Sequence, residues 1–148
     1  MTKIDKVLFS GKTHTTISRR DGASRGAHGS LDLKLSGSDG QEQVLAAVQP
    51  HPIAEQLFAG AWSACYITAI GLVAAQMKVT LPADLAVDIE VDLGQTGAAW
   101  LLRARLDVHV PGLAQDVAEK IAHAADEICP YSKATRGNID VALNVFTA

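Results

Sequence analysis

Two cysteines are the residues of this chain best suited to redox chemistry. Cys65 lies in the middle of an apolar segment, and Cys129 opens the run Cys129-Pro130-Tyr131-Ser132. They lie far apart in the sequence, which excludes a CxxC motif or a zinc knuckle, and two cysteines are too few for a disulfide framework. They are therefore either reactive thiols or small residues of the core.

Cys65 taken alone is better explained as a core residue, because free cysteine is among the most buried residue types. A nucleophilic thiol needs thiolate character, which normally comes from a nearby cation or a helix N-terminus. A position in the middle of a helix gives little help from the helix dipole, so a cation would have to come from elsewhere in the fold.

Arg20 and Glu55 are the candidates for that support. An arginine from the turn Arg19-Arg20-Asp21-Gly22 could stabilise the thiolate, and a carboxylate could hold its planar guanidinium in place. Glu55 precedes Cys65 by about three helical turns, roughly 15 Å of rise, so we expect no direct contact between them. Spacing alone favours a solvated turn residue for Arg20 and a first-turn acid for Glu55.

Cys129-Pro130-Tyr131-Ser132 invites comparison with the CPYC motif of glutaredoxins. A thioredoxin-like motif follows a strand and opens a helix, whereas here we expect the cysteine to close a helix. The next residues, Ala134-Thr135-Arg136-Gly137-Asn138, are expected to form a polar connection to the last strand. A cysteine at a helix end beside a loop moves more readily than one in mid-helix, which suits a resolving thiol.

Other kinds of site have no support in the sequence. The five histidines show no metal-binding spacing, so we expect no metal site. There is no GxGxxG, Walker or GxSxG motif, which argues against nucleotide binding and serine hydrolase chemistry.

Composition indicates one soluble domain over residues 1–148. The chain is 48% hydrophobic and 20% charged, with a net charge of -3, and its basic residues are scattered. We therefore expect neither nucleic-acid binding nor attachment to a membrane. No apolar run of signal-peptide length follows Met1, so a cytoplasmic location is expected. The uncharged segment Leu57–Ala75 resembles a membrane span, but its small and polar residues favour a buried core helix.

The periodicity of the remaining chain predicts an α+β fold. Alternation predicts strands over residues 3–17 and 31–35, a hairpin over 85–110 and a closing strand over 139–145. Helical spacing predicts helices over 54–78 and 113–128. Two amphipathic sheets and one helix that is apolar nearly all round leave more dry surface than a monomer easily covers, so we expect a homodimer.

The sequence resembles the organic hydroperoxide resistance (Ohr) branch of the OsmC-like family over nearly its whole length. The resemblance rests on Glu55-Gln56-Leu57-Phe58-Ala59, on Ser63-Ala64-Cys65-Tyr66 and on the specific stretch from Cys129 to Val141. It implies antiparallel sheets wrapped around two long central helices in an intertwined homodimer. It also implies a thiol peroxidase that acts on organic hydroperoxides in the response to oxidative stress.

The resemblance assigns a role to each candidate residue. Cys65 would attack the peroxide and become a sulfenic acid, and Cys129 would condense with it to a disulfide. The family's arginine lies in an Arg-Asp/Asn-Gly turn, which selects Arg20, although Arg19 remains an alternative. The family's glutamate maps to Glu55.

The resemblance also implies an external reductant and an apolar substrate. The reductant would be a dihydrolipoyl group on a lipoylated protein, with no bound cofactor. Phe58, Ile128 and Tyr131 are the expected walls for an alkyl or lipid tail. Two other functions stay open: a carrier of a hydrophobic ligand with inert cysteines, and a redox sensor that signals through the same disulfide.

Overall fold

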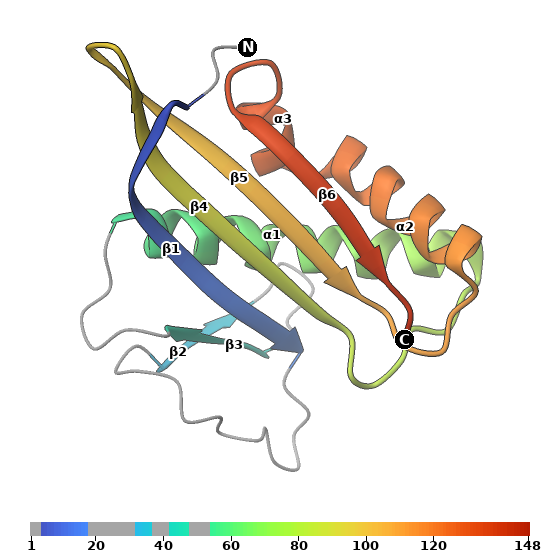
Figure 1. The fold of residues 1–148 in the computed structure, drawn as a ribbon. Helices are drawn as coiled ribbons and strands as arrows, with labels where there is room; N and C mark the ends of the chain where they lie inside the picture. The colour runs from blue at the N-terminus through green and yellow to red at the C-terminus, as the bar shows by residue number, and fades with distance from the viewer. Residues whose placement is uncertain (1–3, 18–31, 37–41, 48–53) are drawn as a thin grey trace.

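A computed structural model describes residues 4–17, 32–36, 42–47 and 54–148 (Figure 1). Within these ranges the chain forms a six-stranded sheet that packs against helices. The α+β class predicted from the sequence is confirmed. In chain order the elements are β1 (Lys6–Ile17), β2 (Asp32–Ser36), β3 (Glu42–Ala47), α1 (Ala54–Met77), β4 (Ala86–Thr96), β5 (Ala99–His109), α2 (Gln115–Ile128), α3 (Pro130–Thr135) and β6 (Asp140–Phe146).

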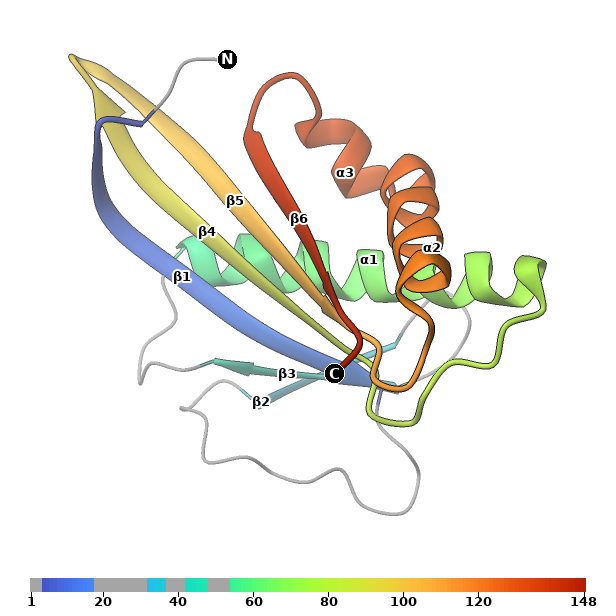
Figure 2. The same ribbon diagram turned by 45° about the vertical axis from the view of Figure 1, so that its right-hand side comes forward.

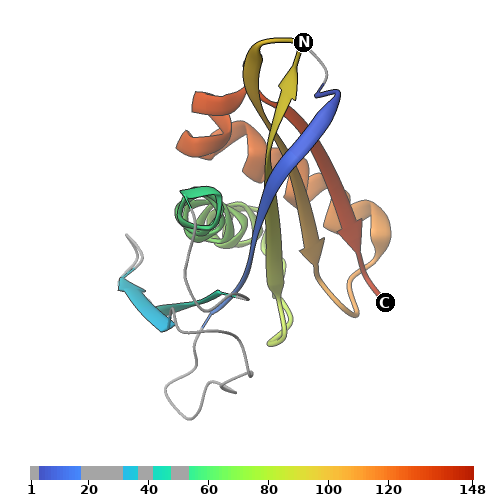
Figure 3. The same cartoon turned by 60° about the vertical axis from the view of Figure 1, so that its left-hand side comes forward.

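The described strands form one sheet in the order β2-β3-β1-β4-β5-β6, so the division into two sheets was wrong. Neighbouring strands are antiparallel except β5 and β6, which are parallel. A parallel pair needs a crossover connection, and here α2 and α3 provide it. Figure 3, seen nearly along α1, shows the sheet curving around this helix, with β2 and β3 on its far side from α3.

Most elements lie where the periodicity predicted them, with two omissions. The hairpin of β4 and β5 turns at Gly97, whose φ of 58° favours glycine. Strand β3 was not predicted, because its two polar residues are followed by four apolar ones and show no alternation. Helix α3 was not predicted either, and it occupies part of the predicted polar connection.

Helix α1 is the centre of the core (Figure 2). It packs on β1 and β4 along one face of the sheet, which we call the inner face, and α2 packs beside it. Trp62, Tyr66, Ile67 and Ile70 on α1 are fully buried. By length and composition α1 could cross a membrane, but 56% of its most apolar window is buried against the rest of the chain, as expected for a core helix.

The start of α1 crosses β1 at Gly11 without room for a side chain. A Cβ added to Gly11 would lie 2.4 Å from the backbone nitrogen of Gln56. Further along, the hydroxyls of Thr15 on β1 and Ser63 on α1 lie 2.6 Å apart in the core. The strand therefore follows the helix for about two turns at close range, which sets the position of the residues that follow on α1.

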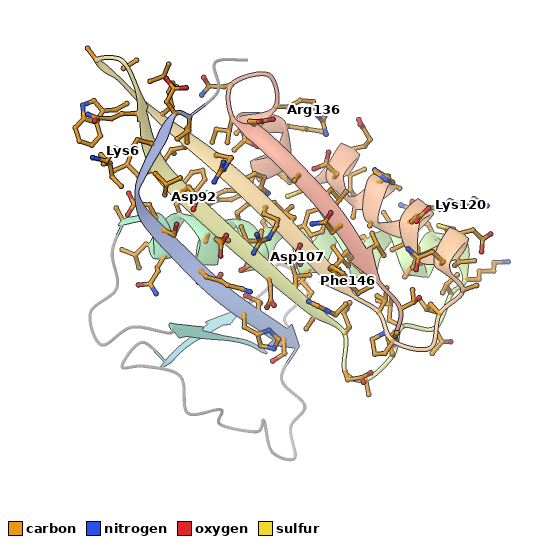
Figure 4. The ribbon with its side chains drawn as sticks, viewed as in Figure 1. Lys6, Asp92, Asp107, Lys120, Arg136 and Phe146 are labelled. Atoms are coloured by element: carbon orange, nitrogen blue, oxygen red, sulfur yellow. The ribbon has the colours of Figure 1, made fainter. Side chains whose placement is uncertain are left out.

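The opposite, outer face of β1, β4 and β5 carries charged side chains (Figure 4). Asp92 accepts hydrogen bonds from Ser10 and from Arg103, whose Nε lies 3.0 Å away. Asp88 pairs with His14, and lies 3.6 Å from Lys12 and 3.5 Å from His109. The alternation that keeps the inner face dry thus places the charges together on the other side.

Candidate functional site

The structure brings the two cysteines together. The Sγ atoms of Cys65 and Cys129 lie 3.5 Å apart, and both thiols are free. This separation is within hydrogen-bonding distance for sulfur, and about 1.5 Å longer than a disulfide bond. The two thiols could therefore close to a disulfide after a small movement, which the sequence spacing could not show.

Cys65 reaches this position because α1 is continuous through it. The residue lies near the middle of α1 and is partly buried, while Trp62 and Tyr66 on either side are fully buried. Tyr66 donates a hydrogen bond of 2.7 Å from its hydroxyl to the carbonyl oxygen of Ala122 on α2. This bond joins α1 to α2 at Ala122, about two helical turns before Cys129.

Cys129 occupies the junction between two helices. Its backbone N–H closes α2 by donating to Ala125, and its own carbonyl accepts from Lys133 to begin α3. Pro130 follows in the first turn of α3, where a missing N–H costs nothing. Cys129 thus closes a helix, as predicted, but it also opens one, which the sequence analysis did not expect. Its side chain is fully buried.

The described residues around Cys65 favour its thiol form. Burial raises the pKa of Cys65 to about 11, and the contact with the Cys129 thiol acts in the same direction. Among the described residues, the influence that lowers this pKa is a hydrogen bond from the backbone of Tyr131. That N–H lies in the first turn of α3, where backbone N–H groups have no partner within the helix. A reactive thiolate would need a further source of positive charge.

The structure tests the other predicted catalytic residues only in part. Arg20 and its alternative Arg19 lie outside the described residues. Glu55 lies in the first turn of α1, partly buried, beside Gly11 of β1. The helix between Glu55 and Cys65 is unbroken, so the two residues are separated by roughly 15 Å along its axis and do not meet.

Of the three predicted substrate-wall residues, two lie close to Cys129 in the chain and one lies on α1. Ile128 and Tyr131 flank Cys129 and are about 40% exposed, at 40% and 41%. Phe58 lies on α1 two turns before Cys65, so the two side chains project from the same side of the helix. Its ring packs edge-on against Trp62, with the centroids 5.9 Å apart. Apolar side chains that are accessible near a thiol fit an apolar substrate.

A second pair of residues near the thiols, joined by a hydrogen bond, was not predicted from the sequence. The indole Nε1 of Trp62 donates a hydrogen bond of 3.1 Å to the hydroxyl of Ser132 on α3, and both residues are buried. The signal was their spacing: Trp62 precedes Cys65 by three positions and Ser132 follows Cys129 by three. Because α3 was not predicted, the spacing did not indicate that Ser132 and Cys129 lie on the same side of a helix.

A pocket of about 250 Å³ opens beside α3, α2 and β6. Trp62 and Ser132 form part of its wall, but neither cysteine lines it. Arg136 lies at the same place, next to Asp126 of α2, and is labelled in Figure 4. We therefore do not place the reacting thiols in this pocket.

Comparison with known proteins identifies the family. The sequence model of the OsmC-like protein family matches residues 46–144. The chain is 35% identical to the organic hydroperoxide resistance protein of Xanthomonas axonopodis pv. citri, over 98% of this chain and 99% of that protein.

Solved structures agree with this result. A structure from Legionella pneumophila, described as an organic hydroperoxide resistance protein OsmC, is 38% identical, with a TM-score of 0.61 over 78% of this chain and 80% of that one. The organic hydroperoxide resistance protein OhrB of Bacillus subtilis is 28% identical, with a TM-score of 0.61 over 88% and 95% of the two chains. This chain belongs to the OsmC-like family, in its organic hydroperoxide resistance (Ohr) branch.

Proposed function

We propose that this chain is a thiol peroxidase that reduces organic hydroperoxides, with Cys65 as the attacking thiol and Cys129 as the resolving thiol. The observation that carries the proposal is the distance of 3.5 Å between their Sγ atoms, in a chain whose relatives are named for organic hydroperoxide resistance. We further propose that it acts in the cytoplasm, where thiols are kept reduced.

The proposed reaction has two thiol steps. The Cys65 thiolate forms a bond to the distal peroxide oxygen, the O–O bond breaks, and the departing alkoxide takes up a proton and leaves as an alcohol. Cys65 is then a sulfenic acid. The sulfur of Cys129 attacks the sulfenic sulfur, the S–O bond breaks, and water leaves as the disulfide forms. Phe58, Ile128 and Tyr131 would hold the organic part of the substrate.

Thiolate formation is the step that the described residues support least. With a pKa raised to about 11, Cys65 is a thiol at neutral pH. We propose that Arg20 supplies the missing positive charge at the thiolate and the developing alkoxide, and that Glu55 orients its guanidinium. Arg20→Gln should then slow peroxide attack about 100-fold, and Arg19→Gln should have little effect. The reverse result would assign the role to Arg19.

We propose that a dihydrolipoyl group on a lipoylated protein reduces the disulfide and closes the cycle. Its two thiols would become the cyclic lipoyl disulfide as Cys65 and Cys129 regain their protons. Steady-state turnover of cumene hydroperoxide with dihydrolipoamide, compared with glutathione and thioredoxin, tests the reductant. Faster turnover with either alternative would overturn this part of the proposal.

The homodimer is proposed from the surface of α1. Leu57 and Leu72 on this helix are 50% and 53% exposed, and Met77 at its end is 41% exposed. Large apolar side chains along the central helix of the core are unusual on a monomer surface, so we propose that a second copy covers them. Sedimentation should show a dimer that Leu72→Glu weakens. A monomer at micromolar concentration would refute it.

Counting thiols tests the main proposal. One equivalent of organic hydroperoxide should remove two thiols from the native chain, and Cys65→Ser should abolish turnover. Cys129→Ser should still allow a single round of attack, which leaves a sulfenic acid on Cys65. A ligand carrier would lose no thiols, and a redox sensor would form the disulfide without sustained turnover. Full activity in Cys65→Ser would exclude the assignment.

A further inference from the structure

Helices α1 and α3 meet through two contacts with matching spacing. Trp62 and Cys65 are three positions apart on α1, and Cys129 and Ser132 are three positions apart at the start of α3. Cys65 faces Cys129 at 3.5 Å, and Trp62 faces Ser132 at 3.1 Å. Positions three apart lie on one side of a helix, so the two contacts are neighbours and join the same side of α1 to the same side of α3.

Both residues of the Trp62–Ser132 contact are buried. Trp62 is 0% exposed and Ser132 is 2% exposed, so a movement of the serine would break a hydrogen bond between two buried groups. The serine also belongs to the hydrogen-bonded frame of α3, because its carbonyl accepts from the Thr135 hydroxyl at 3.0 Å and from the backbone of Arg136 at 3.0 Å. Moving Ser132 therefore means moving α3, and an unpaired buried donor opposes that movement.

A different contact holds the far end of α3. Arg136, just after the helix, binds the Asp126 carboxylate at 2.7 Å and its carbonyl oxygen at 3.0 Å. This contact is exposed and joins α3 to α2, so it does not fix the distance between α3 and α1. In addition to the contact between the two thiols, the bond from Trp62 to Ser132 joins the side chains of α1 and α3 directly.

We propose that Trp62 and Ser132 are positioning residues, whose hydrogen bond holds α3 against α1 so that Cys129 and the backbone N–H of Tyr131 stay on Cys65. The inference rests on the proposed function and adds to it two residues that touch neither substrate nor the reacting sulfur atoms. Two properties depend on the bond: how readily the two sulfurs join, and how acidic Cys65 is.

Both properties follow from the geometry of α3. When glutathione disulfide oxidises the pair, the S–S bond between Cys65 and Cys129 forms, the S–S bond of glutathione disulfide breaks, and the two protons pass to two glutathione thiols. The equilibrium constant of this exchange measures how well the fold already holds the two sulfurs together. The Tyr131 N–H is the described influence that lowers the pKa of Cys65, and it sits between Cys129 and Ser132 in the first turn of α3. If α3 separates from α1, both effects weaken together.

The variants are chosen to separate positioning from general stability. Ser132→Ala removes the acceptor, Trp62→Phe removes the donor, and Ser132→Thr keeps a hydroxyl. Tyr66→Phe is the matched control, because it removes one buried aromatic hydrogen bond from the same helix, but to Ala122 on α2. Thermal unfolding of each variant verifies that it is folded before comparison.

The first measurement is the equilibrium between the Cys65–Cys129 disulfide and a glutathione redox buffer. Ser132→Ala and Trp62→Phe should each lower the effective concentration of the two thiols about fivefold to tenfold, the value of one buried hydrogen bond. The double variant should lose no more than either single one, and Ser132→Thr should restore most of the effect. Tyr66→Phe should change it less than about twofold.

The second measurement is the pH profile of Cys65 alkylation by iodoacetamide in a Cys129→Ser background. Ser132→Ala should move the midpoint to higher pH, and Tyr66→Phe should not. An unchanged thiol equilibrium and midpoint in folded Ser132→Ala, or equal changes in Tyr66→Phe, would overturn the inference. Neither measurement uses a peroxide, so failure of the proposed peroxidase would be seen separately, as full activity in Cys65→Ser.

Discussion

The inner and outer faces of the sheet hold their polar side chains in different ways. On the inner side, which comprises the inner face and the helices packed on it, neutral groups make short buried hydrogen bonds, such as Tyr66 to Ala122 and Thr15 to Ser63. On the outer face, the partly exposed side chains of Lys12 and Arg103 pair with Asp88 and Asp92. A buried bond that loses one partner costs the desolvation of the other, whereas exposed ion pairs are weak and screened by salt. The buried hydrogen bonds of the inner side therefore fix how the elements pack, whereas the stability contributed by the ion pairs of the outer face depends on pH and salt.

The largest expected effect is at the crossing of β1 and α1 on the inner face. Gly11→Ala should destabilise the chain by about 2–3 kcal/mol, because the new Cβ would meet the backbone of Gln56 rather than a side chain that can move. Urea unfolding measures the change. Lys12→Ala, one residue further on the outer face, is the control and should cost less than about 1 kcal/mol. Equal losses would mean that the two faces do not differ here.

At Asp92, the outer face of the described strands holds a charge that is nearly as buried as the inner polar groups. Asp92 is 6% exposed and accepts bonds from Ser10 and Arg103, so Asp92→Asn should cost about 1–3 kcal/mol. Asp116→Asn on α2, whose exposed carboxylate pairs with Lys120, should cost about 0.3 kcal/mol. Urea midpoints compare them. If Asp92→Asn cost no more stability than Asp116→Asn, burial would not determine how much the ion pairs of the outer face contribute.

The pair of His14 and Asp88 should make stability depend on pH. The hydrogen bond to Asp88 raises the pKa of His14 above 6.5, although burial opposes it. Burial raises the pKa of Asp88, but the bond to His14 and the charges of His14, Lys12 and His109 bring it below 3.8 overall. The histidine contribution is complete below pH 6.5 and is lost as the pH rises through its folded pKa. The aspartate contribution is present above pH 3.8 and is lost as the pH falls.

His14→Gln should therefore destabilise the chain most between about pH 4 and 6.5, by less than about 1 kcal/mol because the His14 side chain is 44% exposed. The difference should vanish at high pH. Unfolding free energies of both proteins across this range measure it. A difference that is constant with pH would show that the ring acts by packing rather than by charge.

The smallest expected effect is a difference in how the stability of outer-face and inner-side variants depends on salt. Arg105 lies 3.3 Å from Glu90 and 3.2 Å from Asp107, and Arg105→Gln should cost about 0.5 kcal/mol at low salt. This cost should disappear in about 1 M salt, where the Debye length is about 3 Å. The cost of Tyr66→Phe should stay the same across that series, since its bond is neutral and buried. A salt-dependent Tyr66→Phe would contradict the comparison.

Much of the fold could be predicted because its signals are local. The alternation along β4 and β5 and the helical spacing of α2 are visible in short windows, and each marks one dry face. The missed elements lack such a signal. Strand β3 is defined by pairing with β1 and β2. Helix α3 has six residues and begins at Pro130, and a helix this short depends on its contacts for stability.

The candidate site divides in the same way. The sequence by itself determined which residues could react, because Cys65 and Cys129 are the only cysteines and their flanking residues match the Ohr branch. Only the tertiary structure decided that the two sulfurs lie 3.5 Å apart and that Ser132 faces Trp62. The chemistry that a side chain can perform depends on its residue type, which the sequence shows directly. The distance between two residues 64 positions apart depends on how whole helices pack. That packing is set by Gly11, by buried hydrogen bonds and by a short helix that no local pattern reveals.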